Sequence, residues 1–218
     1  FGMHNITGMF LFNRRDYVNL RNTDRTGSVP YRRQGIAGRA SYNYLQRYFA
    51  EFNFGYNGSE RFARHERYGF FPAAGVTWNI SSEPFWRGGV AKVIDKLRLK
   101  ATYGLVGNDA ISSNRFFYLS DVNMNDTGKN VWYGTDFNVI RPGITVRRYS
   151  NNDITWEIAR KLNLGFEMRL FDKVELQVDY FTENRSNILL ERTNLPSSMG
   201  LEASVEANVG RAKSHGVE

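Results

Sequence analysis

The chain has 218 residues, of which 41% are hydrophobic and 15% aromatic, with a formal net charge of +7 and no cysteine. The mean hydropathy is -0.50, and no apolar run approaches the roughly 18 residues of a membrane-spanning helix. These values exclude a helical membrane protein, disulfides and thiolate chemistry. The first residues lack a basic stretch ahead of an apolar one, so no secretory signal is expected and the start is typical of the interior of a longer protein.

Apolar residues recur at every second position along much of the chain, which predicts β-strands with one apolar and one polar face. In the third such segment, Tyr48, Phe52 and Phe54 lie on one face, and Glu51 and Asn53 lie on the other. The predicted strands, in chain order, are 6–12, 36–44, 48–57, 74–80, 97–105, 162–170, 174–180 and 208–218.

Strand length separates a soluble sheet from a membrane barrel. Soluble strands average about 5 to 6 residues and outer-membrane strands about 10, a length that several of these segments reach. Tyr48 and Tyr56 lie about 26 Å apart along a strand and about 19 Å apart along the normal of a membrane crossed at ~45°. That spacing fits two aromatic girdles. The sequence therefore predicts an all-β fold, an antiparallel transmembrane β-barrel segment of about eight strands whose polar face lines the lumen.

Turn length predicts the orientation of the barrel. Only residues 45–47 and 171–173 separate two pairs of strands, and such short turns are periplasmic. By alternation, the longer segments 14–33, 58–67, 108–153 and 184–205 lie outside the cell, whereas 82–95 is periplasmic and long enough to hold a helical turn. Segment 108–153 lacks strand-length alternation and is rich in Asn, Asp and Gly, so we predict one large external loop.

Two groups of residues are candidates for contact with a ligand or partner. In the large loop, four aromatic side chains either form a ligand-facing surface or, as is commoner, pack the loop against itself. They are Tyr118, Trp132, Tyr133 and Phe137. On the polar face, six charged residues are expected to face the lumen: Arg98, Lys100, Glu167, Arg169, Glu175 and Asp179.

No residue pattern predicts an enzyme, a cofactor or a metal site. The three histidines are widely spaced, and no nucleophile motif accompanies His65. Asp121, Asn123 and Asn125 match the first, third and fifth positions of a calcium loop, but the sixth and twelfth positions hold Asp and Trp, so ordinary turn chemistry is expected. The basic residues come singly or in pairs, which is typical of a solvated surface and argues against nucleic-acid binding.

A family resemblance rests on two long runs, RYGFFPAAGVTWNISSEPFW at 67–86 and DKLRLKATYGLVGND at 95–109. They closely resemble the barrel of SusC/RagA-type TonB-dependent transporters of the Bacteroidetes outer membrane. NGSERF at 57–62, NNDITWE at 151–157 and NVGRAKSHGVE at 208–218 agree in order and spacing. The resemblance spans about residues 34–218. Asn152 and Ser214 replace the family's usual Pro and Asn without disturbing a strand.

The resemblance implies an internal segment of a larger, 22-stranded, plugged barrel in outer-membrane lipid. Residues 1–218 would form one partial barrel domain, with the plug, the TonB box and the remaining strands outside it. The family's activity is energy-coupled import: a SusD-like surface lipoprotein delivers an oligosaccharide or oligopeptide, and TonB pulls on the plug. The six lumen-facing charges would then contact the plug or line the substrate path.

Two other classes of protein stay open at this point. A self-contained eight-stranded outer-membrane barrel with a structural or adhesive role requires the first and last strands to pair. A soluble β-sandwich that binds glycans requires a second sheet against the apolar face, and it would dissolve without detergent.

Overall fold

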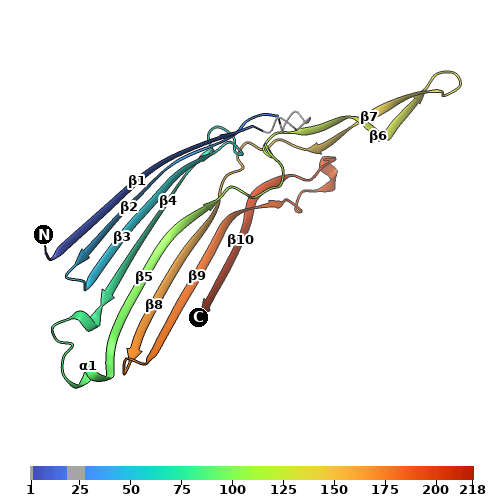
Figure 1. The fold of residues 1–218 in the computed structure, drawn as a ribbon. Helices are drawn as coiled ribbons and strands as arrows, with labels where there is room; N and C mark the ends of the chain where they lie inside the picture. Colours follow the sequence, from blue (N-terminus) through green and yellow to red (C-terminus); the bar gives the residue numbers. More distant parts are fainter. Residues whose placement is uncertain (1, 19–27) are drawn as a thin grey trace.

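The structure, a computed structural model, describes residues 2–18 and 28–218. Eight strands form one antiparallel sheet in the order β1-β2-β3-β4-β5-β8-β9-β10, and β6 and β7 form a separate hairpin (Figure 1). The elements are β1 (His4–Tyr17), β2 (Tyr31–Tyr44), β3 (Tyr48–Ser59), β4 (Tyr68–Asn79), η1 (Ile80–Ser82), α1 (Gly89–Val93), β5 (Ile94–Asn108), β6 (Asp121–Tyr133), β7 (Val139–Arg148), β8 (Glu157–Leu170), β9 (Val174–Glu191), η2 (Ser197–Met199) and β10 (Glu206–Val217). None of the described helices is long and apolar enough to cross a membrane.

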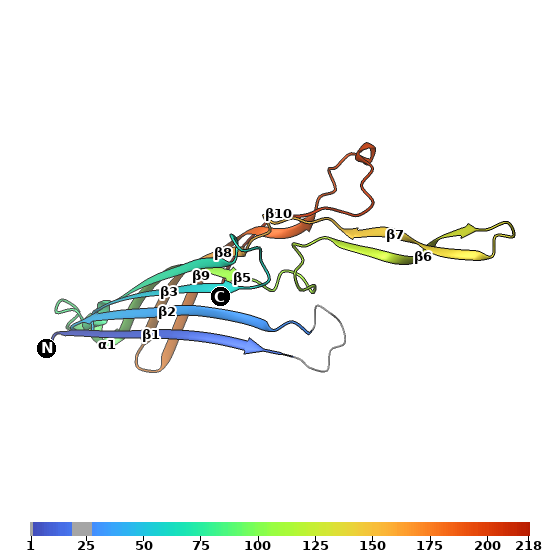
Figure 2. The same ribbon diagram turned by 90° about the horizontal axis from the view of Figure 1, so that it is seen from above.

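The eight strands of the sheet confirm the predicted all-β, up-and-down arrangement. They lie side by side in one curved layer (Figure 2). Within residues 2–18 and 28–218, no ladder joins β1 to β10, so the eight strands do not close on themselves as a small barrel would. The only other sheet in these ranges is the β6–β7 hairpin, which argues against a sandwich. The sheet is an open arc.

The two ends of the arc differ in the length of their connections, as turn length predicts. At one end, called the short-turn end, lie turns 45–47 and 171–173 and the segment carrying η1 and α1 (Figure 1). Each short turn is closed by one backbone hydrogen bond, from Arg47 N to Tyr44 O at 2.9 Å and from Lys173 N to Leu170 O at 3.0 Å. Connections 60–67, 109–156 and 192–205 lie at the opposite, long-loop end.

The strands continue further toward the long-loop end than alternation predicts. β9 continues to Glu191, and the ends of β1 and β2 occupy part of the predicted loop 14–33, whose residues 19–27 lie outside the described ranges. The prediction that 108–153 has no strands is wrong, because β6 and β7 lie within it and project beyond the sheet. A hairpin exposed on both sides has no face to bury, so its sequence carries little alternation.

The apolar face of the sheet carries two aromatic rows, one near each end. Near the short-turn end, the Tyr48 ring lies 6.4 Å from the rings of both Tyr44 and Trp78. Near the long-loop end, Tyr56 stacks on Tyr68 at 5.3 Å. Large apolar side chains between the rows stay exposed, among them Phe52, Phe70 and Val76. An exposed apolar band between aromatic rows is typical of a strand surface that faces lipid.

A small hydrophobic cluster, the loop cluster, fixes the long connections to the sheet. Phe62, Phe117, Ile154 and Trp156 are buried, and the Phe62 ring meets Phe117 edge-on at 5.8 Å. Asn208 of β10 joins this cluster to the sheet. Its side-chain amide accepts a hydrogen bond from Thr155 N at 2.9 Å and donates one to Thr155 O at 3.0 Å. Connections 60–67, 109–120 and 149–156 therefore pack as one unit.

Replacing Phe62 with alanine is expected to loosen this unit. The ring is fully buried, so its loss removes apolar contacts and leaves a cavity, at a cost of about 3 to 5 kcal/mol. The full-length receptor with Phe62→Ala should be cleaved faster by trypsin in segments 60–67 and 109–120. Phe85→Ala is the control, because Phe85 is exposed. Equal cleavage rates in the two variants would contradict the packing role.

Candidate substrate-facing surface

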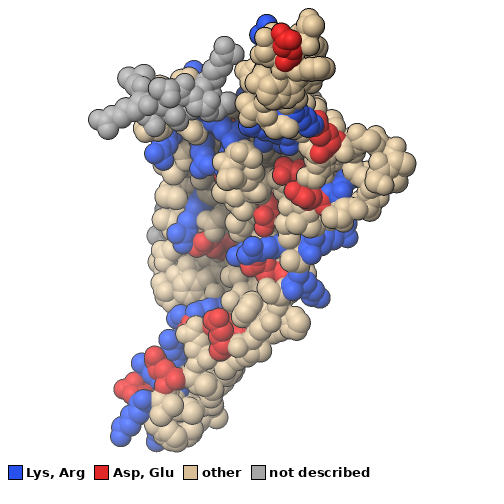
Figure 3. Space-filling view, turned by 90° about the vertical axis from the view of Figure 1, so that its right-hand side faces the viewer, with Lys and Arg blue, Asp and Glu red and all other residues tan. Residues whose placement is uncertain are grey.

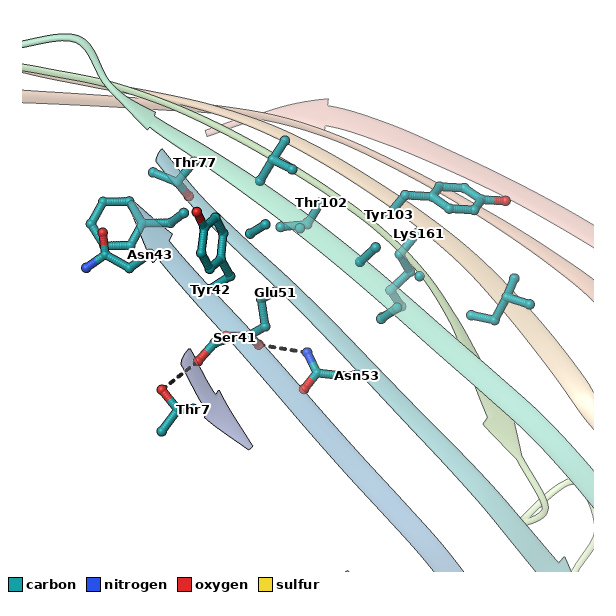
Figure 4. Close-up of a pocket in the computed structure, with 18 of the residues that line it drawn as sticks. Thr7, Ser41, Tyr42, Asn43, Glu51, Asn53, Thr77, Thr102, Tyr103 and Lys161 are labelled. Carbon is teal, nitrogen blue, oxygen red and sulfur yellow. Dashed lines mark hydrogen bonds between the residues drawn. The ribbon is translucent and has the colours of Figure 1, made fainter. Parts of the chain in front are cut away.

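The polar face of the sheet carries hydrogen-bonding side chains in register across neighbouring strands. Ser41 donates from its hydroxyl to Thr7 Oγ1 at 3.1 Å, joining β2 to β1. In β3, Asn53 donates to Glu51 Oε1 at 2.7 Å (Figure 4). A shallow cavity of about 640 Å³ extends along these strands, and Thr77, Thr102 and Lys161 add further polar groups to its wall. The surface offers hydroxyls, amides and isolated charges to a polar ligand.

A carboxylate surrounded by three cations lies on this face between β5 and β8. Arg98 and Glu167 are paired in register, and Glu167 Oε2 lies 3.6 Å from Arg98 Nη1 and 3.4 Å from Lys96 Nζ. Lys100 forms a salt bridge to the other carboxylate oxygen. The Glu167 side chain is only 14% exposed. The four residues are called the Glu167 cluster.

The remaining predicted polar-face residues lie on β8 and β9, beside this cluster. Arg169 pairs with Asp95 at 2.5 Å and with Asp172 at 3.4 Å, and Glu175 lies opposite Arg169 in register. Asp179 accepts from Gln177 at 2.7 Å. The structure thus brings the six charges onto one face, and contact with a plug or substrate stays a prediction.

Acidic and basic side chains are interspersed over much of the face that Figure 3 shows. Lys96 and Asp95 were missed by the predicted strand, which begins at residue 97. Lys96 is nevertheless in phase with Arg98 and Lys100, so extending the alternation by one step would have found it.

The aromatic side chains of the predicted loop separate into two groups. Trp132, Tyr133 and Phe137 lie toward the tip of the β6–β7 hairpin and are 54%, 54% and 68% exposed. The exposure of these three rings favours a contact surface over packing of the loop against itself. Tyr118 lies before β6, and its ring meets Phe116 edge-on at 6.4 Å. The exposed group is called the tip aromatics.

The residues that match a calcium-loop spacing do not encircle a centre. Asp121, Asn123 and Asn125 belong to strand β6, although Asn123 does accept a local bond from Asn125 N at 3.2 Å. Asp126 accepts from the Thr145 hydroxyl and from Gly128 N, and these bonds hold the pKa of its carboxyl below the ordinary range. The extended backbone of β6 spreads the side-chain oxygens along the strand, whereas a calcium loop must place its oxygen ligands around the ion.

One buried carboxylate, Glu83, fixes the segment between β4 and β5. It lies in the connection at the short-turn end, where Trp78 Nε1 donates to it at 3.1 Å and Arg47 lies 3.5 Å away. A hydrogen bond with Tyr48, supported by Trp78 and by the positive charge of Arg47, holds the pKa of Glu83 below its ordinary value of 4.5. The ionised form is therefore the one that the fold stabilises.

The lowered pKa of Glu83 predicts a loss of local order in acid. Because the folded pKa lies below the unfolded one, the stabilisation is complete above pH 4.5 and disappears as the pH falls through the folded value. Hydrogen exchange in segment 80–93 of the full-length receptor, corrected for intrinsic rates, should rise as the pH falls below 4.5. Glu83→Gln should remove this pH dependence. A pH-independent wild type would contradict the assignment.

The comparisons with known proteins agree with this geometry. Residues 2–218 match the family described as TonB dependent receptor-like, beta-barrel. TonB-dependent receptor P26 of Formosa agariphila is 28% identical over 210 residues, covering 93% of this chain and 20% of the relative. TonB-dependent receptor SusC of Bacteroides thetaiotaomicron is 27% identical over 184 residues, covering 83% of this chain and 17% of the relative.

A solved structure shows the same fold. The RagAB peptide importer in its open-open state superimposes with a TM-score of 0.75 at 20% identity, covering 99% of this chain and 25% of that chain. This chain spans about a fifth of the length of the two curated relatives. Since the family match runs over almost every residue and the open arc has one lipid-type face, the chain belongs to the TonB-dependent receptor β-barrel family of the outer membrane.

Proposed function

We propose that this arc is part of the wall of a wide, plugged barrel that imports an oligosaccharide or oligopeptide with energy from TonB. The observation that carries the proposal is the two-faced arc itself. The eight strands of the described residues leave both edges open, and their polar face offers hydrogen-bonding groups and charges, as at Ser41, Asn53 and Glu167. A wide lumen with such a wall suits a large polar substrate, and barrels of about 22 strands with a plugged lumen are the transporters of this architecture.

We propose that residues 1–218 form one partial barrel domain. The plug and the TonB box would belong to other parts of the same receptor, as the length of the curated relatives supports. The polar-face charges, including the Glu167 cluster, would hold the plug or line the substrate path. No catalytic, cofactor or metal role is assigned to any residue.

The long-loop end is proposed to face the outside of the cell and to meet a SusD-like surface lipoprotein. The names of the relatives support such a partner, since SusC and the RagAB importer are both similar to this chain. The tip aromatics are the part of this end that is best suited to a protein contact, because buried Trp and Tyr side chains contribute most to interface energies.

The import proposal is tested with the full-length receptor in its own outer membrane. Uptake of a fluorescent oligosaccharide and of a fluorescent peptide should both be measured in cells with TonB and in cells without it. We expect uptake of one of the two to fall to the level of receptor-free cells when TonB is removed. Uptake that persists without TonB would contradict energy-coupled import. If cells with and without the receptor took up both probes equally, import by this receptor would be contradicted.

A further inference from the structure

A basic pocket lies at the long-loop end of β1 and β2. It has a volume of about 540 Å³, and its wall holds five arginines, two tyrosines, two serines and a single glutamate. The arginines are Arg15, Arg32, Arg33, Arg61 and Arg115. In strand register, Arg15 and Arg33 are in phase with the polar-face residues Thr7 and Ser41, so these two side chains lie on the polar face. We call this site the arginine pocket.

The positive charge of the arginine pocket is only partly balanced. Arg33 pairs with Asp109 at 2.9 Å, Arg32 with Asp16 at 3.4 Å and Arg115 with Glu60 at 2.6 Å. The other two arginines of the pocket, Arg15 and Arg61, have no carboxylate within 4 Å among the described residues.

The two arginines without a carboxylate differ in what surrounds them. Arg61 donates instead to the backbone oxygens of Ser112 and Asn114, and its buried Nε has no described partner. Arg15 lies directly opposite Arg33 in the β1–β2 ladder. Like charges in directly opposed positions destabilise a sheet, and an anion bound between them would offset that repulsion.

Part of the pocket wall is fixed before any ligand arrives. The guanidinium of Arg115 lies 3.8 Å from the centre of the Tyr31 ring, and it donates to the carbonyl oxygens of Val29 and Pro30, each at 2.5 Å. Its side chain is 9% exposed. A wall that is already ordered loses little conformational entropy on binding, which favours affinity.

From this charge and geometry we infer that the arginine pocket binds acidic sugar units, bearing a carboxylate or a sulfate ester, of an oligosaccharide. The planar fork of a guanidinium matches the paired oxygens of both groups. The wall offers aromatic rings and hydroxyls for a sugar ring, and the described residues that line it include no aliphatic side chain that would receive the apolar groups of a peptide. The inference rests on the proposed import function, for which it specifies the substrate as an anionic glycan.

Binding is tested by calorimetry on the full-length receptor in detergent, with no TonB present. The probes are a galacturonate tetrasaccharide, a sulfated galactose tetrasaccharide, a neutral galactose tetrasaccharide and tetraglutamate. We expect at least one acidic sugar to bind about tenfold or more tightly than the neutral one, and its affinity to fall as salt is raised. Equal affinity for acidic and neutral sugars would overturn the proposal, and so would tighter binding of tetraglutamate than of either acidic sugar.

Variants locate the binding to this pocket. Arg15→Gln combined with Arg61→Gln should weaken binding of the acidic sugar by about tenfold or more and leave the neutral sugar unchanged. Arg14→Gln is the matched control, because Arg14 lies next to Arg15 on the opposite face of β1 and is exposed. An equal loss in the control, or no loss in the double variant, would overturn the assignment. Because these measurements need no energy source, acidic-sugar binding that survives while TonB-dependent uptake fails would contradict the import proposal alone.

Discussion

Glu167→Gln is expected to lower the free energy of unfolding of the full-length receptor by about 1 to 3 kcal/mol, between the values for exposed and for buried ion pairs. The substitution leaves Lys96, Arg98 and Lys100 facing one another without the carboxylate that now separates them. Like charges at this distance repel strongly where water is partly excluded. Guanidinium titration of the purified receptor in detergent measures the change.

Glu175→Gln is the matched control for this effect. Glu175 lies on the neighbouring strand and on the same face, but it has no cation within 4 Å in the described part of the chain. Glu175→Gln should change the midpoint of the guanidinium titration very little. If both variants shifted the midpoint equally, the effect would come from the overall charge of the polar face and not from the Glu167 cluster.

If the proposed SusD-like lipoprotein is the partner, removal of the tip aromatics is expected to weaken its capture by more than about tenfold. The variant combines Trp132→Ser, Tyr133→Ser and Phe137→Asn. Asparagine is chosen at residue 137 because its φ of 51° lies in the left-handed region, which Asn tolerates. The three exposed rings would otherwise bury a large apolar area against a partner. Co-purification and calorimetry with the purified lipoprotein measure the loss.

The control for the hairpin variant removes apolar surface from the opposite end of the barrel. Phe85→Ser and Val90→Ser lie in the connection that holds α1, and both side chains are exposed. This pair should leave lipoprotein capture unchanged. Unchanged capture by the hairpin variant would instead show that the tip aromatics do not contact the lipoprotein.

The sheet itself was predictable because the membrane imposes a period of two on it. Wherever a strand has lipid on one side and polar groups on the other, alternate residues must differ, as Phe52, Asn53 and Phe54 do. The turns 45–47 and 171–173 were equally predictable, because a connection of so few residues can only be a tight reversal of the chain. Beyond the aromatic rows no lipid requires alternate residues to be apolar. The predicted strands therefore end before the observed strand ends at Tyr31 and Glu191.

The β6–β7 hairpin was missed because nothing forces its residues to alternate. Its ladder is interrupted at three points, including the step from Asp126 to Val131, and apolar residues 131–133 follow one another directly. The loop cluster was missed for a related reason. Phe62, Phe117 and Trp156 come from three separate connections, so their contact depends on tertiary structure that periodicity does not encode.

Alternation predicts which charged residues lie on the polar face, but it does not predict which of them form ion pairs with one another. Alternation assigns Arg98, Lys100 and Glu167 to one face, whereas their contact depends on β5 pairing with β8. That pairing skips the whole hairpin, and only the register shows that Arg98 lies opposite Glu167. The arginine pocket likewise joins residues from β1, β2 and two connections.

Cysteine labelling along β3 tests whether the apolar face of the sheet meets lipid and the polar face meets water. The chain has no native cysteine, so single substitutions at Phe52, Phe54, Glu51 and Asn53 can be introduced into this segment of the receptor. In outer-membrane vesicles, cysteines at 52 and 54 should react with a lipid-soluble maleimide, and those at 51 and 53 with a water-soluble one. Equal labelling of both pairs by either reagent would contradict the two-faced barrel wall.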